Sequence, residues 1–166
     1  EYNRHKACGI RCCFVNHITD DRYGSGTTIT KTHNQNSITN DKSCKKLTDV
    51  LWECENYDAF FINEGQFFDD LYEGVNYLVN MQNKKVYVCG LDGDFQRREF
   101  GSILKILPLC DDVVKLKAIC KSCKIRDGIF TFRLSDEKEQ MLVGTDNYTA
   151  LCRNCYNLLK NPEQNV

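Results

Sequence analysis

The 166-residue chain has little of what marks several classes of protein. It has only two prolines and no Gly/Ser-rich linker or low-complexity tract, which excludes a fibrous or disordered chain. Its uninterrupted apolar runs span a few residues, whereas a membrane-spanning helix needs about 20. The net charge is −1, so the chain has no bulk attraction for nucleic acid or an anionic membrane. These absences predict a soluble globular fold of one domain, or of one domain with a small appendage.

Cysteine, in contrast, is abundant, with eleven residues. The polar and basic residues 1–13 do not resemble a secretory signal, so we expect a reduced, cytoplasmic protein with a metal site rather than a disulfide scaffold. Seven cysteines outside the paired motifs are expected to be small buried hydrophobic residues: Cys8, Cys12, Cys13, Cys44, Cys54, Cys89 and Cys110. The histidines lie in polar contexts and are assigned no role: His5, His17 and His33.

Strand and helix patterns alternate along residues 1–119. Apolar runs predict strands over 12–15, 59–62, 85–91 and 113–119. Helices are predicted over 1–8, 44–55, 69–82 and 101–107, with Asp41 or Ser43 capping the second, Asp69 and Asp70 beginning the third and Pro108 closing the last. Residues 20–43 are expected to form a loop. This alternation predicts an α/β fold with a mostly parallel sheet over residues 1–119.

The pattern changes after residue 119, where two Cys-x-x-Cys pairs flank a polar segment. Cys120 and Cys123 are separated from Cys152 and Cys155 by 28 residues, which we expect to contain two strands joined by a turn over 135–138. Four thiolates in two pairs suit a closed tetrahedral zinc site of structural type. Two disulfides or four free thiols remain as alternatives. The sequence therefore predicts a small zinc-binding β lobe over residues 120–160.

Acidic and aromatic side chains follow two of the predicted strands. Glu64, Phe67 and Phe68 come after strand 59–62, and Asp92 and Phe95 come after strand 85–91. In open α/β sheets, ligands bind at the carboxyl ends of the strands. A carboxylate there suits a general base, and aromatic rings suit a flat ligand. The alternative is that the rings belong to the core, but two strand ends of the same character favour a site.

At these residues the chain resembles the thymidine kinases of the human cytosolic and poxvirus type. The shared motifs are Asp20-x-Arg22-Tyr23, residues 64–68, residues 91–97, Phe100, residues 108–109, residues 113–116, both cysteine pairs, Arg133-Leu134 and Tyr148. The resemblance implies a P-loop-kinase-like sheet with a zinc lobe that carries a lasso over the nucleoside. It implies transfer of the ATP γ-phosphoryl group to the 5′-hydroxyl of thymidine or deoxyuridine, which makes dTMP by salvage. Mg²⁺, feedback inhibition by dTTP and a homotetramer are implied as well.

The resemblance also assigns roles to residues. Glu64 matches the general base on the 5′-hydroxyl. Enclosure of thymine is implied for Phe67, Leu91, Phe95, Phe100, Thr131 and Tyr148, and backbone contacts to the base for the lasso residues Gln140, Leu142 and Val143. Four residues are placed near the phosphates and Mg²⁺: Asp20, Arg22, Asn63 and Gln66. For Arg97, a phosphate-binding and a structural role both remain open.

The chain departs from the family pattern in two places. The family's G-x-x-x-x-G-K-[ST] loop, expected before residues 1–8, does not occur in it. Asn63 stands where the family has an aspartate that supports Mg²⁺, and a neutral amide holds that ion less well. The main hypothesis is an active kinase whose P-loop precedes Glu1. The alternative is an inactive kinase-like domain that serves as a structural or oligomerisation partner of an active copy in a pseudo-tetramer. A nucleic-acid-binding zinc ribbon is disfavoured by the charge.

Overall fold

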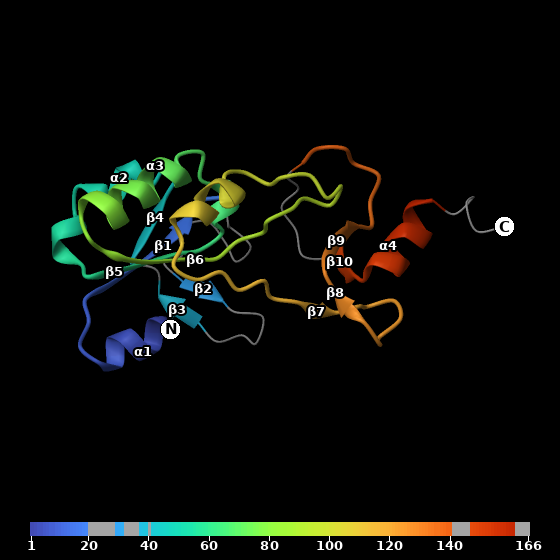
Figure 1. Ribbon diagram of the computed structural model, residues 1–166, viewed down its shortest axis with the longest axis horizontal. Coiled ribbons are helices and arrows are strands. Elements are labelled where there is room, and N and C mark those ends of the chain that lie inside the picture. The colour runs from blue at the N-terminus through green and yellow to red at the C-terminus, as the bar shows by residue number, and fades with distance from the viewer. Residues whose placement is uncertain (20–28, 32–36, 40, 141–146, 162–166) are drawn as a thin grey trace. The chain divides into compact units, whose positions relative to one another are not determined.

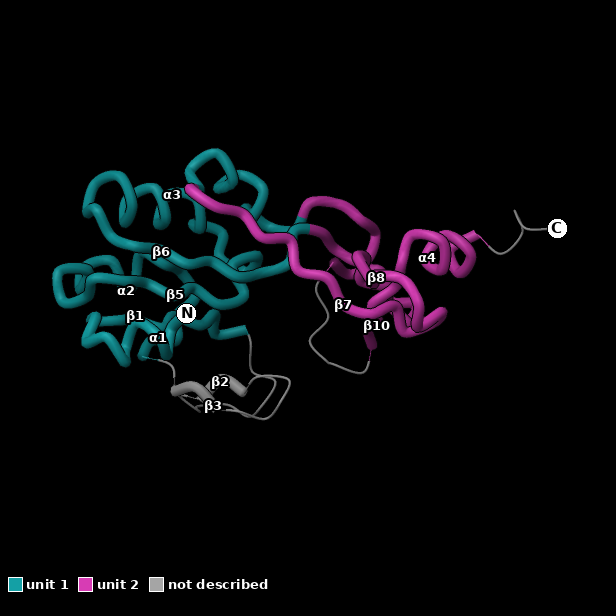
Figure 2. Tube along the Cα trace, turned by 60° about the horizontal axis from the view of Figure 1, so that its bottom comes forward, with its two compact units in different colours: residues 1–92, 100–110 teal, residues 93–99, 111–166 magenta. Residues whose placement is uncertain are grey.

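The computed structural model describes residues 1–19, 29–31, 37–39, 41–140 and 147–161 (Figure 1). The chain forms two compact units that do not follow a single boundary along the sequence (Figure 2). Unit 1 comprises residues 1–92 and 100–110, and unit 2 comprises residues 93–99 and 111–166. Among the described residues, every helix is too short or too polar to cross a bilayer.

Unit 1 contains a four-stranded parallel sheet, which confirms the predicted α/β fold. Its strands are β4 (Lys42–Cys44), β1 (Cys12–His17), β5 (Ala59–Ile62) and β6 (Lys85–Val88), hydrogen-bonded in that order. Cys12 lies opposite Ala59, which lies opposite Lys85. All residues of β1 and β5 are buried, as expected for central strands that are covered on both faces. The carboxyl ends of the strands therefore meet at one edge of this sheet.

Helical segments cover the two faces of this sheet (Figure 1). They are α1 (Tyr2–Ala7), α2 (Thr48–Leu51), η1 (Cys54–Asn56), η2 (Gly65–Phe67), α3 (Leu71–Asn76), its π-helical continuation η3 (Tyr77–Met81) and η4 (Ile103–Leu109). Successive residues of a strand point to opposite faces. Accordingly, Phe60 and Ile62 pack in the same cluster as Leu71 of α3, whereas Phe61 packs in a second cluster with Tyr2 of α1. The predicted helix over 69–82 is confirmed by α3 and η3.

Several local predictions in unit 1 are wrong, because contacts between distant residues decide them. The expected loop over 20–43 contains β2 (Ile29–Lys31), paired antiparallel with β3 (Ser37–Thr39), and β4 adds to the edge of the parallel sheet. The helix expected over 44–55 is shortened to α2 and η1, and Asp70 caps it by accepting the Leu47 N–H at 3.0 Å. Neither predicted residue caps it, and Asp41 instead accepts the Phe14 N–H at 2.7 Å. Pro108 lies inside η4 and does not close it.

Unit 2 is built around an antiparallel strand pair, β9 (Phe130–Arg133) and β10 (Tyr148–Leu151). A second pair, β7 (Ala118–Ile119) and β8 (Asp127–Gly128), and helix α4 (Arg153–Lys160) complete it. The predicted turn over 135–138 is wrong, because β10 begins only at residue 148. The strand predicted over 113–119 is reduced to β7, and Leu116 is 85% exposed. An apolar run forms a buried strand only where a partner strand exists, and a local pattern does not reveal the partner.

Candidate active site

Glu64 lies directly after β5 and has a left-handed backbone conformation, with φ 51° and ψ 45°. Such a conformation costs a non-glycine residue about 1–2 kcal/mol and is concentrated at functional sites. Hydrogen bonds on both sides hold it. The Asn63 N–H donates to the Val15 carbonyl at 2.9 Å, and the Gly65 N–H donates to the Cys89 carbonyl at 2.9 Å. Pairing with both neighbouring strands therefore fixes the backbone around this half-buried carboxylate.

Gln66 holds the carboxylate of Glu64 from the side. Its Nε2 donates to Glu64 Oε2 at 2.6 Å, and its Oε1 accepts the Leu91 N–H at 3.0 Å. The side chain is only 4% exposed, and a Cβ on Gly90 would lie 2.5 Å from its Oε1. Gly101, with φ +58°, passes too close to the Gln66 carbonyl for any side chain. The structure thus brings Gln66 together with Glu64 in one rigid arrangement.

The amide of Asn63 has neutral partners at both of its ends. Its Nδ2 donates to Oδ1 of the buried Asn16 at 2.9 Å, and its Oδ1 accepts the Cys89 thiol at 3.1 Å. Asn63 is therefore built into a hydrogen-bonded row across the carboxyl ends of β1, β5 and β6.

Cys89 is exposed, as are Cys8 and Cys110, so the expectation that the unpaired cysteines are buried is wrong at these three positions. Their apolar sequence neighbours do not cover them.

Aromatic rings lie next to the Glu64 turn in unit 1. Phe67 packs edge-to-face against Phe100 with ring centroids 5.7 Å apart, and Leu91 is 44% exposed. His17 is buried beside Phe67 and Phe68, with centroid separations of 5.7 and 4.7 Å. Burial lowers the pKa of His17, which favours the neutral ring. Both ring nitrogens have polar partners: Nε2 lies 3.1 Å from the Lys45 carbonyl, and Nδ1 accepts the Thr19 N–H at 3.1 Å.

Of the other two histidines, only His5 lies among the described residues. His5 is also buried, and its ring packs edge-to-face against Phe61 and Tyr87. Its ring nitrogens also have polar partners, the Glu1 carbonyl at 3.1 Å and the Tyr87 hydroxyl at 3.3 Å. His33 lies outside the described residues.

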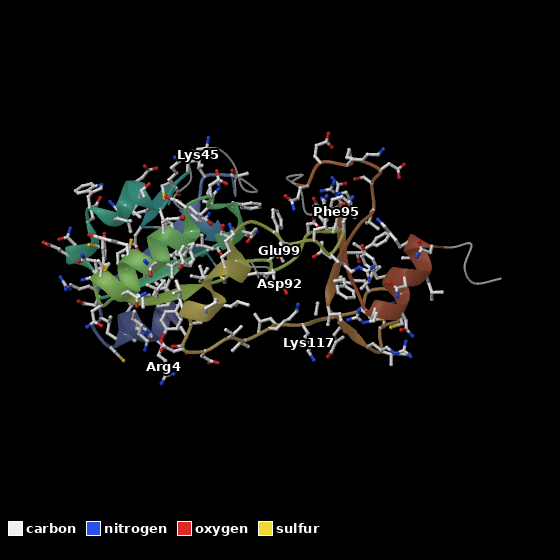
Figure 3. The ribbon with its side chains drawn as sticks, turned by 45° about the horizontal axis from the view of Figure 1, so that its top comes forward. Arg4, Lys45, Asp92, Phe95, Glu99 and Lys117 are labelled. Carbon is white, nitrogen blue, oxygen red and sulfur yellow. The ribbon has the colours of Figure 1, made fainter. Side chains whose placement is uncertain are left out.

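The loop 93–99 carries Phe95 in unit 2 (Figure 3). A bridge between Gly93 and Glu99 closes it, and Asp94 organises its interior. The buried Asp94 carboxylate accepts the Gln96 N–H at 2.8 Å and the Arg98 N–H at 2.9 Å. Burial raises the pKa of Asp94, but the donors outweigh burial, and the net pKa is lowered. The loop is therefore held in shape by an ionised carboxylate at its centre.

Arg97 fixes this loop to the body of unit 2. Its guanidinium lies 4.5 Å from the ring centroid of Tyr156 and donates to Asn157 Oδ1 at 3.2 Å. The Tyr156 hydroxyl in turn donates to the Phe95 carbonyl at 2.6 Å. Of the two roles left open for Arg97, these contacts favour the structural one.

Replacing Asp94 with Ala is expected to destabilise unit 2 by about 2–3 kcal/mol, because hydrogen bonds to a charged acceptor are lost and their donors are left unpaired. The folded pKa lies below the unfolded value, so this stability is present above about pH 4 and is lost as the pH falls through the folded pKa. Urea unfolding at several pH values measures it. The exposed Asp112→Ala serves as the control. Equal midpoints for D94A and wild type at pH 7 would contradict the prediction.

The other predicted nucleoside-binding residues that are described lie in unit 2. Thr131 pairs with Ala150 across β9 and β10, and Tyr148 pairs with Arg133. Gln140 donates through Nε2 to Asp94 Oδ2 at 3.0 Å and to the Glu99 carbonyl at 3.2 Å. The structure therefore joins Gln140 to the loop that carries Phe95. The remaining predicted site residues lie outside the described residues: Asp20, Arg22, Leu142 and Val143.

The four paired cysteines of unit 2 form one cluster. Their sulfur atoms all lie within 4.8 Å of one another, and Sγ of Cys123 is 4.0 Å from Sγ of Cys152. A tetrahedral zinc ion with Zn–S bonds of about 2.3 Å holds its sulfurs about 3.8 Å apart, so the cluster has the dimensions of such a site. Burial raises the pKa of the Cys120 thiol, but backbone hydrogen bonds outweigh burial and lower that pKa to about 6. No disulfide joins these four residues, and their donor set fits zinc.

Comparison with known proteins decides the family. The family model described as thymidine kinase matches residues 1–156. The chain belongs to the thymidine kinase family. It is 38% identical to the thymidine kinase of sheeppox virus (strain KS-1) over 156 residues, which is 92% of this chain and 84% of the viral protein. It is 40% identical to the cytosolic thymidine kinase of Gallus gallus over 162 residues, which is 97% of this chain and 70% of that protein.

Membership confirms the resemblance read from the motifs. Thymidine kinases are phosphotransferases, so the family supports a kinase activity. The matches do not favour the inactive-domain alternative over the enzyme. The Glu64 turn, the Phe95 loop and the cysteine cluster all fall inside the matched range. The sequence did not indicate the contacts of Gln66, Asp94 or Asn16, and Arg133 was visible only as part of a shared motif.

Proposed function

We propose that the protein transfers the γ-phosphoryl group of ATP to the 5′-hydroxyl of thymidine or deoxyuridine, as in nucleoside salvage. The observation that carries the proposal is the Glu64 carboxylate, held at the end of β5 by Gln66 at 2.6 Å. In this reaction the 5′-oxygen gives its proton to Glu64 and attacks the γ-phosphorus, and ADP leaves with the bridging oxygen. The protein's part is to position the hydroxyl and to accept its proton.

We assign thymine binding to the residues that the family pattern marks. They are Phe67, Leu91, Phe95, Phe100, Thr131 and Tyr148, together with the backbone of Gln140, Leu142 and Val143. Aromatic rings bind a flat base by stacking, with edge-to-face and offset arrangements preferred. Backbone N–H and C=O groups satisfy the hydrogen-bonding edge of a pyrimidine without a dedicated side chain. The edge-to-face pair of Phe67 and Phe100 supplies such a surface.

The metal sites are assigned by the chemistry of their ligands. Cys120, Cys123, Cys152 and Cys155 would hold zinc in a structural role. Mg²⁺ bound with ATP would supply neutralisation of the developing phosphate charge. Asn63 offers only a neutral amide, so Asp20 or the substrate phosphates would supply the charge that Mg²⁺ requires. The family pattern assigns Arg22 to the phosphates as well. A cytoplasmic homotetramer inhibited by dTTP completes the proposal.

The test is a phosphoryl-transfer assay on the natural, complete protein. With radiolabelled γ-phosphate in ATP, thymidine is expected to yield labelled dTMP, and deoxyuridine is expected to be accepted. The 5′-deoxy analogue of thymidine serves as the control, since it lacks the accepting hydroxyl. Labelled ATP consumption that does not depend on a nucleoside, or no transfer to thymidine at all, would overturn the proposal.

Replacing Gln66 with Met is expected to lower kcat by about tenfold to a hundredfold, because a hydrogen bond to a charged group contributes about 1.5–3 kcal/mol. The side chain retains a similar length but no longer donates to Glu64 Oε2. Steady-state kinetics with thymidine measures the effect. Gln82→Met, at the end of the neighbouring helix, is the matched control and should have wild-type kcat. An unchanged kcat in a folded Q66M protein would show that Gln66 does not position the base.

A further inference from the structure

Arg133 is the most buried arginine described in unit 2, at 5% exposed, although nothing above gives it a part in the reaction. It ends β9 and lies opposite Tyr148 of β10. Its Nε is buried without a hydrogen-bond partner among the described residues. A buried cation with an unpaired donor does not favour stability by itself. The cost of burying Arg133 must therefore be offset by the contacts that the rest of its guanidinium makes.

The terminal nitrogens of Arg133 anchor the segment that leads to the lasso. Nη1 donates to the carbonyl of Glu137 at 2.9 Å and to that of Glu139 at 2.5 Å. Nη2 donates to the carbonyl of Gln140 at 3.2 Å. Three backbone carbonyls within four residues thus converge on one side chain. The planar fork of an arginine satisfies several acceptors at once, which the single ammonium group of a lysine does in a different geometry.

The same guanidinium fixes two aromatic residues. Its central carbon lies 3.7 Å from the ring centroid of Phe95, and Nη2 donates to the Tyr148 hydroxyl at 2.6 Å. Arg133 is only 5% exposed, and a desolvated cation is attracted most strongly by an aromatic ring. Phe95, Gln140 and Tyr148 come from three separate parts of unit 2, and Arg133 contacts all three.

We infer that Arg133 is a positioning residue for nucleoside binding: it holds Phe95, Tyr148 and the backbone of Gln140 in the arrangement that receives the thymine base. This inference rests on the proposed function, because these three residues are the ones assigned to thymine. Arg133 acts through them and does not touch the reacting atoms. Glu64 and its Gln66 clamp belong to unit 1 and are not part of this network.

The test compares Arg133→Lys with the wild type in the complete protein. We expect the KM and the directly measured Kd for thymidine to rise about tenfold or more, while kcat and the KM for ATP change by less than about threefold. A merely structural role would lower the concentration of active enzyme and leave KM and Kd unchanged, since both are properties of the folded molecules. Arg126→Lys, an exposed arginine of the same unit, is the matched control and should be indistinguishable from wild type.

The outcomes separate this inference from the proposed function. Zinc content and the melting temperature report whether the R133K protein is folded. If R133K does not fold, Arg133→Gln is tested in its place, with the same expected rise in the KM and Kd for thymidine. Wild-type kinase activity together with unaltered thymidine KM and Kd in the folded variant would overturn the inference alone. A wild-type protein that neither binds nor phosphorylates thymidine would overturn the proposed function, and the role of Arg133 with it.

Discussion

Glu64→Gln is expected to lower kcat for thymidine phosphorylation by at least about a hundredfold, since a positioned general base contributes about 10²–10⁴-fold. Glutamine keeps the size and shape of the side chain but has no carboxylate to accept the proton of the 5′-hydroxyl. The KM for thymidine should change little, because the binding of the base is assigned to other residues. When an interaction made only in the transition state is lost, kcat and kcat/KM fall by the same factor.

The control for this variant is Asp69→Asn, an exposed carboxylate five residues further along the chain. It should keep wild-type kinetics, and both variants should melt at the wild-type temperature. The left-handed backbone of Glu64 is set by the neighbouring strands, so an amide in its place should not disturb the turn. If E64Q retains turnover within about tenfold of wild type, Glu64 is not the base.

Cys152→Ser is expected to abolish zinc binding and to unfold the 111–161 part of unit 2. Cys152 is 3% exposed, and its Sγ accepts the Cys155 N–H at 3.5 Å at the start of α4. The buried cluster of unit 2 is small: Cys120, Cys152, Cys155, Leu151 and Tyr156, with the partly buried Cys123, Phe130 and Phe132 packed against them. A structural zinc ion contributes about 10–16 kcal/mol of apparent binding free energy in zinc-finger peptides, and that energy is also folding energy.

Metal analysis by mass spectrometry should find one zinc per wild-type chain and none in C152S. Limited proteolysis should cut the variant within residues 111–161 under conditions in which the wild type is resistant. Cys110→Ser, which replaces an exposed thiol just outside this segment, is the matched control and should retain zinc. Wild-type protein purified without zinc, or a C152S protein that resists proteolysis as the wild type does, would refute the zinc assignment.

The sequence predicts the central strands of unit 1 well, because burial on both faces leaves a continuous apolar run. Residues 59–62 form β5 as expected, and the strand expected over 12–15 extends to His17. The same reasoning fails over 113–119, where the apolar residues between Lys115 and Lys117 and on either side of them are largely exposed. The difference lies in the partner strand, which is set by the fold and not by the run itself. The predicted cap of α2 is wrong for a related reason, since the capping carboxylate belongs to Asp70, which lies 22 residues after Thr48 and accepts its N–H.

The candidate site also contains residues that the sequence indicates and contacts that only the structure shows. Glu64, the aromatic residues and the cysteine pairs could be found from the sequence, because their chemistry and spacing are visible there. The contacts of Asp94 and Arg133 could not, since the sequence does not show the path of the irregular backbone whose N–H and C=O groups turn toward these side chains. The left-handed conformation of Glu64 was also unforeseen, because a glutamate does not signal it as a glycine would. Sequence thus indicates candidate reacting groups, and structure shows which contacts hold them.

The measurement that tests the account most directly is a structure of the complete protein with thymidine bound. The account predicts a carboxylate oxygen of Glu64 within about 2.6–3.2 Å of the 5′-oxygen, the distance that proton transfer requires. It also predicts that the thymine ring contacts Phe95 and Tyr148. A thymidine whose 5′-oxygen faces another side chain, with Glu64 beyond hydrogen-bonding reach, would contradict it.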